Sequence, residues 1–255
     1  MALYISSLNS GSNGNCYYIG NTQEAILVDA GISCRETEKR MKRLGLSMDR
    51  VKAIFVSHEH SDHIRGIETL SRKYRLPVYM TPGTFLCCGL SLDGDLVNHF
   101  HSFQPVNIGY LVVTPFPKNH DASDPHSFVV SCQDVKVGIF TDLGTACPTV
   151  VNYFSQCQAA FLETNYDEDL LFSGRYPYFL KRRISGDKGH LSNRQALELF
   201  TAHRGEAFSH LLLSHLSADN NRPDLVEKLF LEYAGNTQIV VAPRTVETPV
   251  FTVDN

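Results

Sequence analysis

The chain lacks the features that mark secreted and membrane-spanning proteins. Its seven cysteines are odd in number and show no CxxC spacing, so a disulfide framework is not expected. No window approaches the roughly 20 apolar residues of a membrane span. The first residues carry neither a charged segment nor a long apolar run, so we expect no signal peptide. We therefore predict a cytoplasmic protein without a membrane partner.

The chain also lacks an excess of basic residues, with 23 Lys and Arg against 27 Asp and Glu and a net charge of −4. This balance excludes a broadly cationic surface, but it allows a local basic groove for nucleic acid. No linker, repeat or low-complexity tract divides the sequence. Hydrophobic residues make up 43% of it, which is enough for a substantial core. We therefore predict one domain that covers residues 1–255.

Short apolar runs alternate with one-sided apolar segments along the chain. Runs that end in turn-forming residues predict strands, and segments with apolar residues on one face predict helices. The expected strands cover residues 16–20, 25–29, 51–57, 110–114, 127–131, 135–140, 159–163, 210–214 and 238–241. The expected helices cover residues 35–44, 64–74, 192–203 and 223–233. Interleaved strands and helices predict an α/β fold with mixed sheets.

The segment after the apolar run 53–56 contains three histidines and an aspartate within six positions: His58, His60, Asp62 and His63. Alternate residues of a strand point the same way, so His58 and His60 are expected on one side. The following turn could bring Asp62 and His63 to the same cavity. Imidazole nitrogens and carboxylate oxygens suit zinc and its first-row neighbours. This density of ligands indicates half of a two-metal site rather than a chance polar loop.

Three further metal-competent residues follow predicted strands, and they are His120, Asp142 and His215. Strand ends are where a buried sheet exposes functional groups. Each residue has a structural alternative, such as a surface-loop histidine at position 120 or a turn aspartate at position 142. His126 is a rival to His120, and His210 is a rival to His215.

These residues resemble the motifs of the metallo-β-lactamase-fold hydrolases, in the order in which that family carries them. The strand that ends at Asp29 also resembles an early strand of the family. The resemblance implies a four-layered αββα sandwich with two mixed β-sheets. It implies that His58, His60 and His120 hold one metal, that Asp62, His63 and His215 hold a second, and that Asp142 bridges both. Zinc or manganese is expected as the pair of divalent ions, and iron is possible because the same ligands accept it.

Two histidines separate this chain from other branches of the family. Some lactam-cleaving members replace the last histidine of the motif and so have a different second metal site. This chain keeps that histidine as His63. Iron-dependent redox relatives carry glutamate where this chain has His60. Both residues favour a dinuclear hydrolase.

The chain is also similar to the YycJ-like (WalJ) branch. The shared segments are SGSNGN at 10–15, HDA at 120–122, GHLSN at 189–193 and LSHLS at 213–217. Members of this branch are described as cytoplasmic double-stranded DNA exonucleases that act 5′ to 3′ and are linked to DNA repair. The resemblance therefore implies a phosphodiesterase that uses a metal-bridging hydroxide and takes DNA as its substrate.

Glu163 and His190 resemble a glutamate and a histidine of ribonuclease Z that assist the departing group. Glu163 could hydrogen-bond His190, which would then protonate or stabilise the leaving oxygen. The predicted catalytic residues are thus Asp62, Glu163 and His190. The alternative for His190 is a structural place in the loop that caps the helix 192–203.

Other functions and contacts remain open at this point. The same metal site could hydrolyse a small ester, a lactone or a cyclic nucleotide, or cut RNA as ribonuclease Z does, and the fold could also serve as a non-enzymatic module. The basic runs 39–43 and 181–183 could contact phosphates, although such runs are more often solvated faces. Tyr166, Tyr176 and Tyr178 could stack on bases. The spacing pair His99 and His101 lacks an acidic partner and is interpreted as surface.

Overall fold

The computed structural model of the protein describes residues 1–254, in which the strands form two seven-stranded sheets. In spatial order, the first sheet contains β14 (Phe251–Val253), β1 (Leu3–Asn9), β2 (Cys16–Gly20), β3 (Ala25–Val28), β4 (Val51–Phe55), β5 (Val78–Met80) and β6 (Val97–His99). The second contains β13 (Gln238–Val241), β12 (His210–Ser214), β11 (Ala159–Glu163), β10 (Val135–Phe140), β9 (His126–Cys132), β8 (Leu111–Pro117) and β7 (Val106–Ile108).

Both sheets are mixed. In the first sheet β1, β2 and β14 pair antiparallel, whereas β3, β4, β5 and β6 run parallel to one another. In the second sheet β7 to β10 form an antiparallel meander, and β10 to β13 are parallel. The predicted α/β class with two mixed sheets is therefore confirmed.

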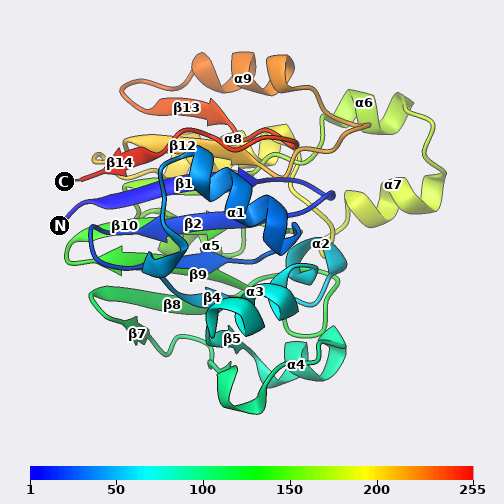
Figure 1. Ribbon diagram of the computed structural model, residues 1–255. Coiled ribbons are helices and arrows are strands. Elements are labelled where there is room, and N and C mark those ends of the chain that lie inside the picture. The colour runs from blue at the N-terminus through cyan, green and yellow to red at the C-terminus, as the bar shows by residue number, and fades with distance from the viewer. Residues whose placement is uncertain (255) are drawn as a thin grey trace.

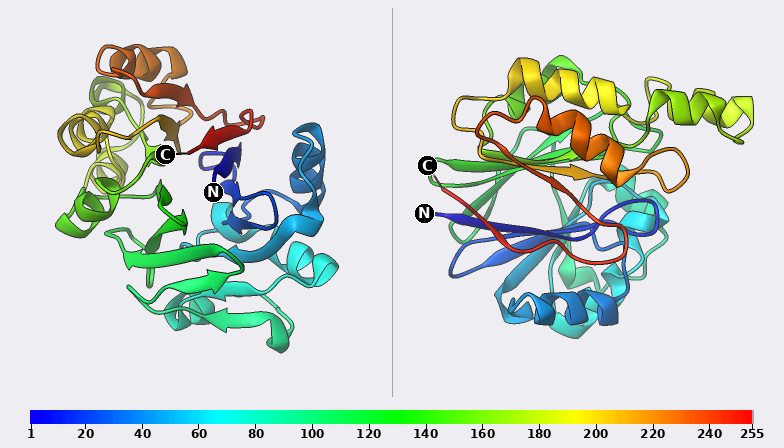
Figure 2. Two further views of the ribbon diagram at one scale, coloured as in Figure 1. Left: turned by 90° about the vertical axis from the view of Figure 1, so that its left-hand side faces the viewer. Right: turned by 90° about the horizontal axis from the view of Figure 1, so that it is seen from above.

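Helices cover the outer face of each sheet (Figure 1, Figure 2). They are α1 (Cys34–Arg43), α2 (Ser61–Ile64), α3 (Ile67–Tyr74), α4 (Pro82–Cys88), α5 (Pro148–Phe154), α6 (Glu168–Ser173), α7 (Tyr178–Ile184), α8 (Asn193–His203) and α9 (Pro223–Leu231). Two short 3-10 turns, η1 (Met48–Arg50) and η2 (Gly94–Leu96), complete the described elements. Helices α1 and α3 pack on the first sheet, and α5, α8 and α9 pack on the second, so four layers result.

Alternation along the strands builds the core on both sides of each sheet. In β3, Ile26 and Val28 face the apolar layer between the sheets, while Ala25 and Leu27 face α1 and α3. This two-residue period is what a strand buried on both faces requires. Aromatic side chains such as Phe128 and Phe161 fill the layer between the sheets.

The helix expected over residues 64–74 begins later, at Ile67, after the separate short helix α2. The break lies at Gly66, because its amide donates to the carbonyl oxygen of Ala30 at 2.7 Å and not to a carbonyl oxygen within a helix. A Cβ atom on Gly66 would lie 2.1 Å from the carbonyl oxygen of Ile32. The loop after β3 therefore packs directly against the turn that follows the histidine motif.

The segment that contains α6 and α7 extends away from the two sheets (Figure 1, Figure 2). No helix was predicted there from the sequence. Among the described residues, no helix is long and apolar enough to cross a membrane.

Candidate metal centre

The predicted site residues gather at one edge of the sandwich, just beyond the ends of several strands. His58, His60, Asp62 and His63 follow β4 and continue into α2. Strands β8, β10, β11 and β12 run in the same direction in the second sheet. Four other predicted residues lie at or just beyond the ends of these strands: His120, Asp142, Glu163 and His215. The carboxyl ends of parallel strands meet at one edge, which is why residues distant in sequence converge here.

Sharp turns at three strand ends carry side chains of this region. Asp29, Asp142 and His215 adopt left-handed backbone conformations, with φ of 58°, 54° and 57°. Such a conformation costs a residue other than glycine about 1–2 kcal/mol. Backbone strain of this kind clusters at functional sites, where the surrounding fold holds it in place.

The first predicted metal set comes together. The donor atoms of His58, His60 and His120 all lie within 4.8 Å of one another. The Nε2 atom of His58 is 3.1 Å from the Nδ1 atom of His60, and the ring of His120 packs against both rings. Three imidazole nitrogens at this spacing could bind one divalent ion.

The second predicted set also comes together, since the donor atoms of Asp62, His63 and His215 lie within 4.8 Å of one another. The Oδ2 atom of Asp62 is 3.6 Å from the Nε2 atom of His63 and 3.7 Å from the Nε2 atom of His215. This set offers one carboxylate and two imidazoles.

Asp142 lies between the two sets. Its Oδ1 atom is 3.8 Å from the Nε2 atom of His120 and 3.6 Å from the Nε2 atom of His215. Its Oδ2 atom is 3.3 Å from the Nε2 atom of His63. The carboxylate thus faces donors of both sets, as a bridging ligand would.

Hydrogen bonds orient the rings so that one nitrogen of each points into the cluster. The Nδ1 atom of His63 lies 2.7 Å from Asp29 Oδ2, and that of His120 lies 3.1 Å from the carbonyl oxygen of Gly189. The Nδ1 atom of His215 lies 2.9 Å from Glu163 Oε1. Each acceptor fixes the proton on Nδ1 and leaves the Nε2 lone pair free for a metal.

Buried polar atoms without partners mark the centre of the cluster. The Nε2 atoms of His120 and His215 and the Oδ2 atom of Asp142 are buried and form no hydrogen bond. Unsatisfied buried groups are rare in folded proteins, and several that face one another are typical of a ligand-binding site. Nitrogen and oxygen donors of this kind fit divalent cations, so the residues present suit the two metals that the family resemblance implies.

Electrostatics favour the metal-binding protonation states of His58, His120 and Asp62. Burial lowers the pKa of His58 well below its ordinary value and lowers that of His120 to about 4. Burial would raise the pKa of Asp62, but His63 and His215 hold that pKa down to about 2. Neutral imidazoles and ionised carboxylates are the forms that coordinate a cation. Burial would also lower the pKa values of His63 and His215, but the surrounding carboxylates raise both, so a metal would displace a proton from each of these two rings.

Glu163 is fully buried and contacts two histidines at once. Its Oε1 atom lies 2.7 Å from the Nδ1 atom of His190 and 2.9 Å from that of His215, and its Oε2 atom accepts from the amides of Leu143 and Leu191. Burial would raise the pKa of Glu163, but His190 and His215 lower it to about 2. The hydrogen bond expected between Glu163 and His190 is present. The contact with His215 was not anticipated.

The loop 10–15 contributes groups that the sequence analysis did not assign to the site. The side-chain amide of Asn15 donates to Asp62 Oδ2 at 3.2 Å and lies 3.0 Å from His63 Nε2. The hydroxyl of Ser10 accepts from the backbone amide of His215 at 2.7 Å. A polar glycine-rich loop between two strands was visible in the sequence, but nothing in its spacing placed it beside the histidines.

The other histidines that the sequence offered as alternatives lie outside the cluster. His126 is buried away from the cluster, with its Nε2 atom 2.8 Å from the hydroxyl of Ser102, and His210 packs against Phe251. His99 and His101 are exposed, as predicted.

Two suggested nucleic-acid contacts are wrong because the side chains are buried. Tyr166 lies in the interior rather than on a surface that bases could reach. Arg40 donates to the carbonyl oxygens of Leu8 and Thr245 and to the side chain of Asn9, so it holds chain segments together. Neither residue is free to contact a substrate.

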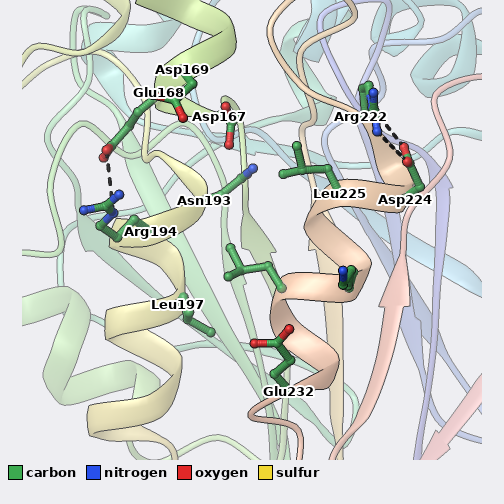
Figure 3. Close-up of a pocket in the computed structure, with 12 residues that line it drawn as sticks. Asp167, Glu168, Asp169, Asn193, Arg194, Leu197, Arg222, Asp224, Leu225 and Glu232 are labelled. Carbon is green, nitrogen blue, oxygen red and sulfur yellow. Dashed lines mark hydrogen bonds and ion pairs between the residues drawn. The ribbon is translucent and has the colours of Figure 1, made fainter.

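A cavity of about 580 Å³ lies between α6, α8 and α9 and is not lined by the histidines and aspartates of the candidate metal centre (Figure 3). Arg194 and Arg222 line it, but each is paired with a neighbouring carboxylate, Glu168 and Asp224 respectively. None of the predicted ligands lines this cavity. Its chemistry therefore gives no reason to place the reaction there.

Comparison with known proteins assigns the family. A family model described as beta-lactamase superfamily domain matches residues 24–216. Exodeoxyribonuclease YycJ of Bacillus anthracis is 36% identical over 230 residues, which cover 88% of this chain and 86% of that protein. Exodeoxyribonuclease WalJ of Streptococcus pneumoniae is 31% identical over 225 residues, which cover 86% of this chain and 84% of that protein.

A solved structure agrees in fold. The metallo-β-lactamase-fold protein YhfI of Bacillus subtilis superposes with a TM-score of 0.76 at 16% identity, over 99% of this chain and 100% of that chain. This match supports the four-layered sandwich and says nothing of the substrate. Taken with the family model and the two relatives, it shows that the chain belongs to the metallo-β-lactamase superfamily, in its YycJ-like (WalJ) branch, and is a hydrolase.

Proposed function

We propose that the protein is a dinuclear metal-dependent phosphodiesterase that degrades DNA from the 5′ end. The observation that carries the proposal is the pair of donor sets that share Asp142, with Glu163 and His190 beside them. The exodeoxyribonuclease names of two relatives that cover most of the chain support DNA as the substrate.

In this proposal His58, His60 and His120 hold one ion, Asp62, His63 and His215 hold the other, and Asp142 contacts both. When bound, two divalent ions act as Lewis acids that neutralise phosphate charge and make water a nucleophile at neutral pH. Zinc or manganese fits these donors, and iron is possible. Asp29 and Glu163 keep His63 and His215 oriented through their Nδ1 atoms.

His190 is the proposed proton donor to the leaving oxygen. Its ring is partly exposed and borders the cluster, 5.2 Å from the rings of His120 and His215 between centroids. An imidazolium at this position would have Glu163 as its carboxylate partner at Nδ1, and its Nε2 atom would remain free to donate. The backbone amides of Leu143 and Leu191 donate to the other oxygen of Glu163, which holds the carboxylate in its orientation toward the His190 ring.

A cytoplasmic location is part of the proposal. All seven cysteines are free thiols, and four of them are buried in the fold: Cys16, Cys34, Cys132 and Cys157. Free thiols in this number are typical of proteins in a reducing compartment.

The test is a substrate panel with protein loaded separately with manganese and with zinc. The panel contains duplex DNA labelled at the 5′ or the 3′ end, a tRNA precursor, a cyclic nucleotide and a set of lactones. We expect DNA to be shortened from its 5′ end, and we expect Asp142→Asn to abolish this loss. Intact nucleic acids together with lactone cleavage that His58→Ala abolishes would show that the nuclease proposal is wrong.

A further inference from the structure

Residues 172–188, which we call the basic arm, present an exposed aromatic and cationic surface next to the metal centre. The arm includes α7, which contains no buried residue. Tyr178 and Phe179 are each 73% exposed, and Phe172 is 52% exposed. Large apolar side chains that are exposed together on one segment are typical of an interaction surface.

Positive charge is concentrated on the basic arm, although the whole chain has a net charge of −4. The arm carries five cations and one carboxylate: Arg175, Lys181, Arg182, Arg183 and Lys188, with Asp187. Arg175 and Arg183 have carboxylate partners outside the arm. Within the described residues, Arg182 and Lys188 form no ion pair, and Lys181 donates only to the backbone carbonyls of Phe172 and Gly174.

The carboxyl-terminal end of the arm is built into the metal centre. Gly189, the next residue, accepts from the Nδ1 atom of His120, and the amide of His190 donates to the carbonyl oxygen of Ile184 at 2.8 Å. Arg183 pairs with Asp121 at 2.6 Å. A cavity of about 100 Å³ lies at this junction, lined by Asp121, Leu180, Arg183, Ile184, Gly189 and His190. A polymer that leaves the metal centre past His190 would therefore meet α7.

The combination of side chains identifies the kind of partner. Bases stack on aromatic rings without regard to sequence, and lysine and arginine neutralise the phosphates between them. In a two-fold dimer formed through this surface, the cations of the two arms would face one another and repel. Charge complementarity therefore favours a polyanion, and the adjacent aromatic residues favour one with unpaired bases.

We propose that the basic arm binds a single-stranded segment of nucleic acid beside the metal centre, with Tyr178 and Phe179 stacking on bases and Lys181 and Arg182 contacting phosphates. This inference rests on the proposed function and specifies how that function recognises its substrate. It also predicts a preference for ends that carry an unpaired overhang over blunt duplex ends.

The experiment measures binding by fluorescence anisotropy with manganese-loaded protein. The probes are a labelled duplex with a single-stranded overhang, the same duplex with blunt ends, and an RNA oligonucleotide, each with phosphorothioate linkages that resist cleavage. The variants are Tyr178→Ala/Phe179→Ala and Arg182→Ala. The matched controls are Tyr233→Ala and Arg72→Ala, which change an exposed aromatic residue and an exposed arginine outside the arm.

We expect the double variant to bind the overhang at least about 30-fold more weakly, because stacking worth roughly 5-fold or more in affinity is lost at each of two bases. Arg182→Ala should lower the slope of log affinity against log salt by about 0.7, the value for one phosphate contact on a single strand. Both controls should bind as the wild type does. Melting temperature and metal content, measured for each variant, show whether it is folded.

The outcomes separate the two proposals. If the wild type degrades DNA and the folded arm variants bind the overhang as tightly as the wild type, the arm proposal is wrong and the proposed function stands. If the double variant changes only the oligomeric state, the aromatic residues form a self-association surface and the arm proposal is also wrong. If the wild type neither binds nor cleaves any nucleic acid, both proposals fail. Tighter binding of the RNA than of the DNA overhang would keep the arm and reassign the substrate to RNA.

Discussion

At the scale of single residues, Asp29 and Glu163 act on the cluster through histidine rings. Asp29 is buried and contacts His63, and it also accepts from the amide and the hydroxyl of Ser57. The backbone of Asp29 is in the left-handed conformation, which is strained, so the surrounding fold must hold this residue in place. Carboxylate partners of this kind orient a ligating histidine and raise its basicity.

Replacing Asp29 by asparagine should therefore weaken metal binding while leaving every donor of the cluster in the chain. We expect the affinity for the second ion to fall by roughly 10- to 100-fold. Competition with a chromophoric chelator measures the two affinities. Asp49→Asn, on the exposed turn η1, is the control and should change neither. Equal affinities in Asp29→Asn and the wild type would remove Asp29 from the proposed site.

The cysteines offer a second test at this scale. Burial raises the pKa of the Cys157 thiol to about 12, and burial with the nearby Glu38 carboxylate raises that of Cys34 to about 11. Cys87, in contrast, is exposed. Since only the thiolate is nucleophilic, iodoacetamide at about pH 8 should modify Cys87 first and leave Cys34 and Cys157 intact in native protein. Mass spectrometry of the digested protein shows the order, and early modification of Cys157 would contradict the buried position assigned to it.

At the scale of elements, α1 and α3 are tied together on the outer face of the first sheet. Glu38 of α1 accepts from the ammonium group of Lys73 at 2.6 Å and from the hydroxyl of Tyr74 at 2.8 Å, both in α3. These hydrogen bonds, with that from the Cys34 thiol, lower the pKa of Glu38 from 4.5 to about 2. The two helices flank the loop and turn that present the histidine motif, so their contact supports the site from outside.

The lowered pKa of Glu38 predicts how stability depends on pH. A carboxyl whose pKa is lower in the folded state stabilises the fold above its ordinary pKa and loses that contribution as the pH falls through the folded value. Wild-type protein should therefore lose stability between about pH 4.5 and pH 2 more steeply than Glu38→Gln does. Urea midpoints across this range measure the difference. Parallel curves would show that ionisation of Glu38 contributes nothing to stability.

Most elements around the site follow from local patterns, and the exceptions have physical causes. The strands at 135–140, 159–163 and 210–214 were predicted with the observed bounds because each is a short, mainly apolar run that the sheet buries on both faces. The helix expected from residue 64 was not continuous, because the close approach of Gly66 to Ile32 is a tertiary contact. Helix α7 has no buried residue and α6 buries only Leu171, so no periodic apolar pattern revealed these two helices.

At the scale of the whole molecule, the two halves of the chain supply complementary parts of one cluster. The first sheet brings the motif 58–63, and the second brings His120, Asp142, Glu163 and His215. Their order along the chain, with the family resemblance, was enough to predict the two donor sets. The contacts of Asn15 and Ser10 could not be predicted, since they depend on how the loop 10–15 crosses the edge of the sandwich.

Arg40 connects distant parts of the molecule. From α1 it donates to the end of β1 and to the carbonyl oxygen of Thr245, near the carboxyl-terminal segment. Replacing Arg40 by alanine would leave these buried acceptors unpaired, so we expect the free energy of unfolding to fall by about 3 kcal/mol. Urea denaturation measures the change, with the exposed neighbour Lys39→Ala as the control. A loss below about 0.5 kcal/mol, typical of surface substitutions, would contradict the role assigned to Arg40.

The central claim is that one cluster binds two metal ions through a shared aspartate. Anomalous X-ray diffraction from crystals of the manganese-loaded protein tests it most directly, because the metals are located without reference to activity. We expect two peaks about 3.5–4 Å apart, one among His58, His60 and His120 and one among Asp62, His63 and His215, both in contact with Asp142. A single peak, or peaks that Asp142 does not touch, would contradict it.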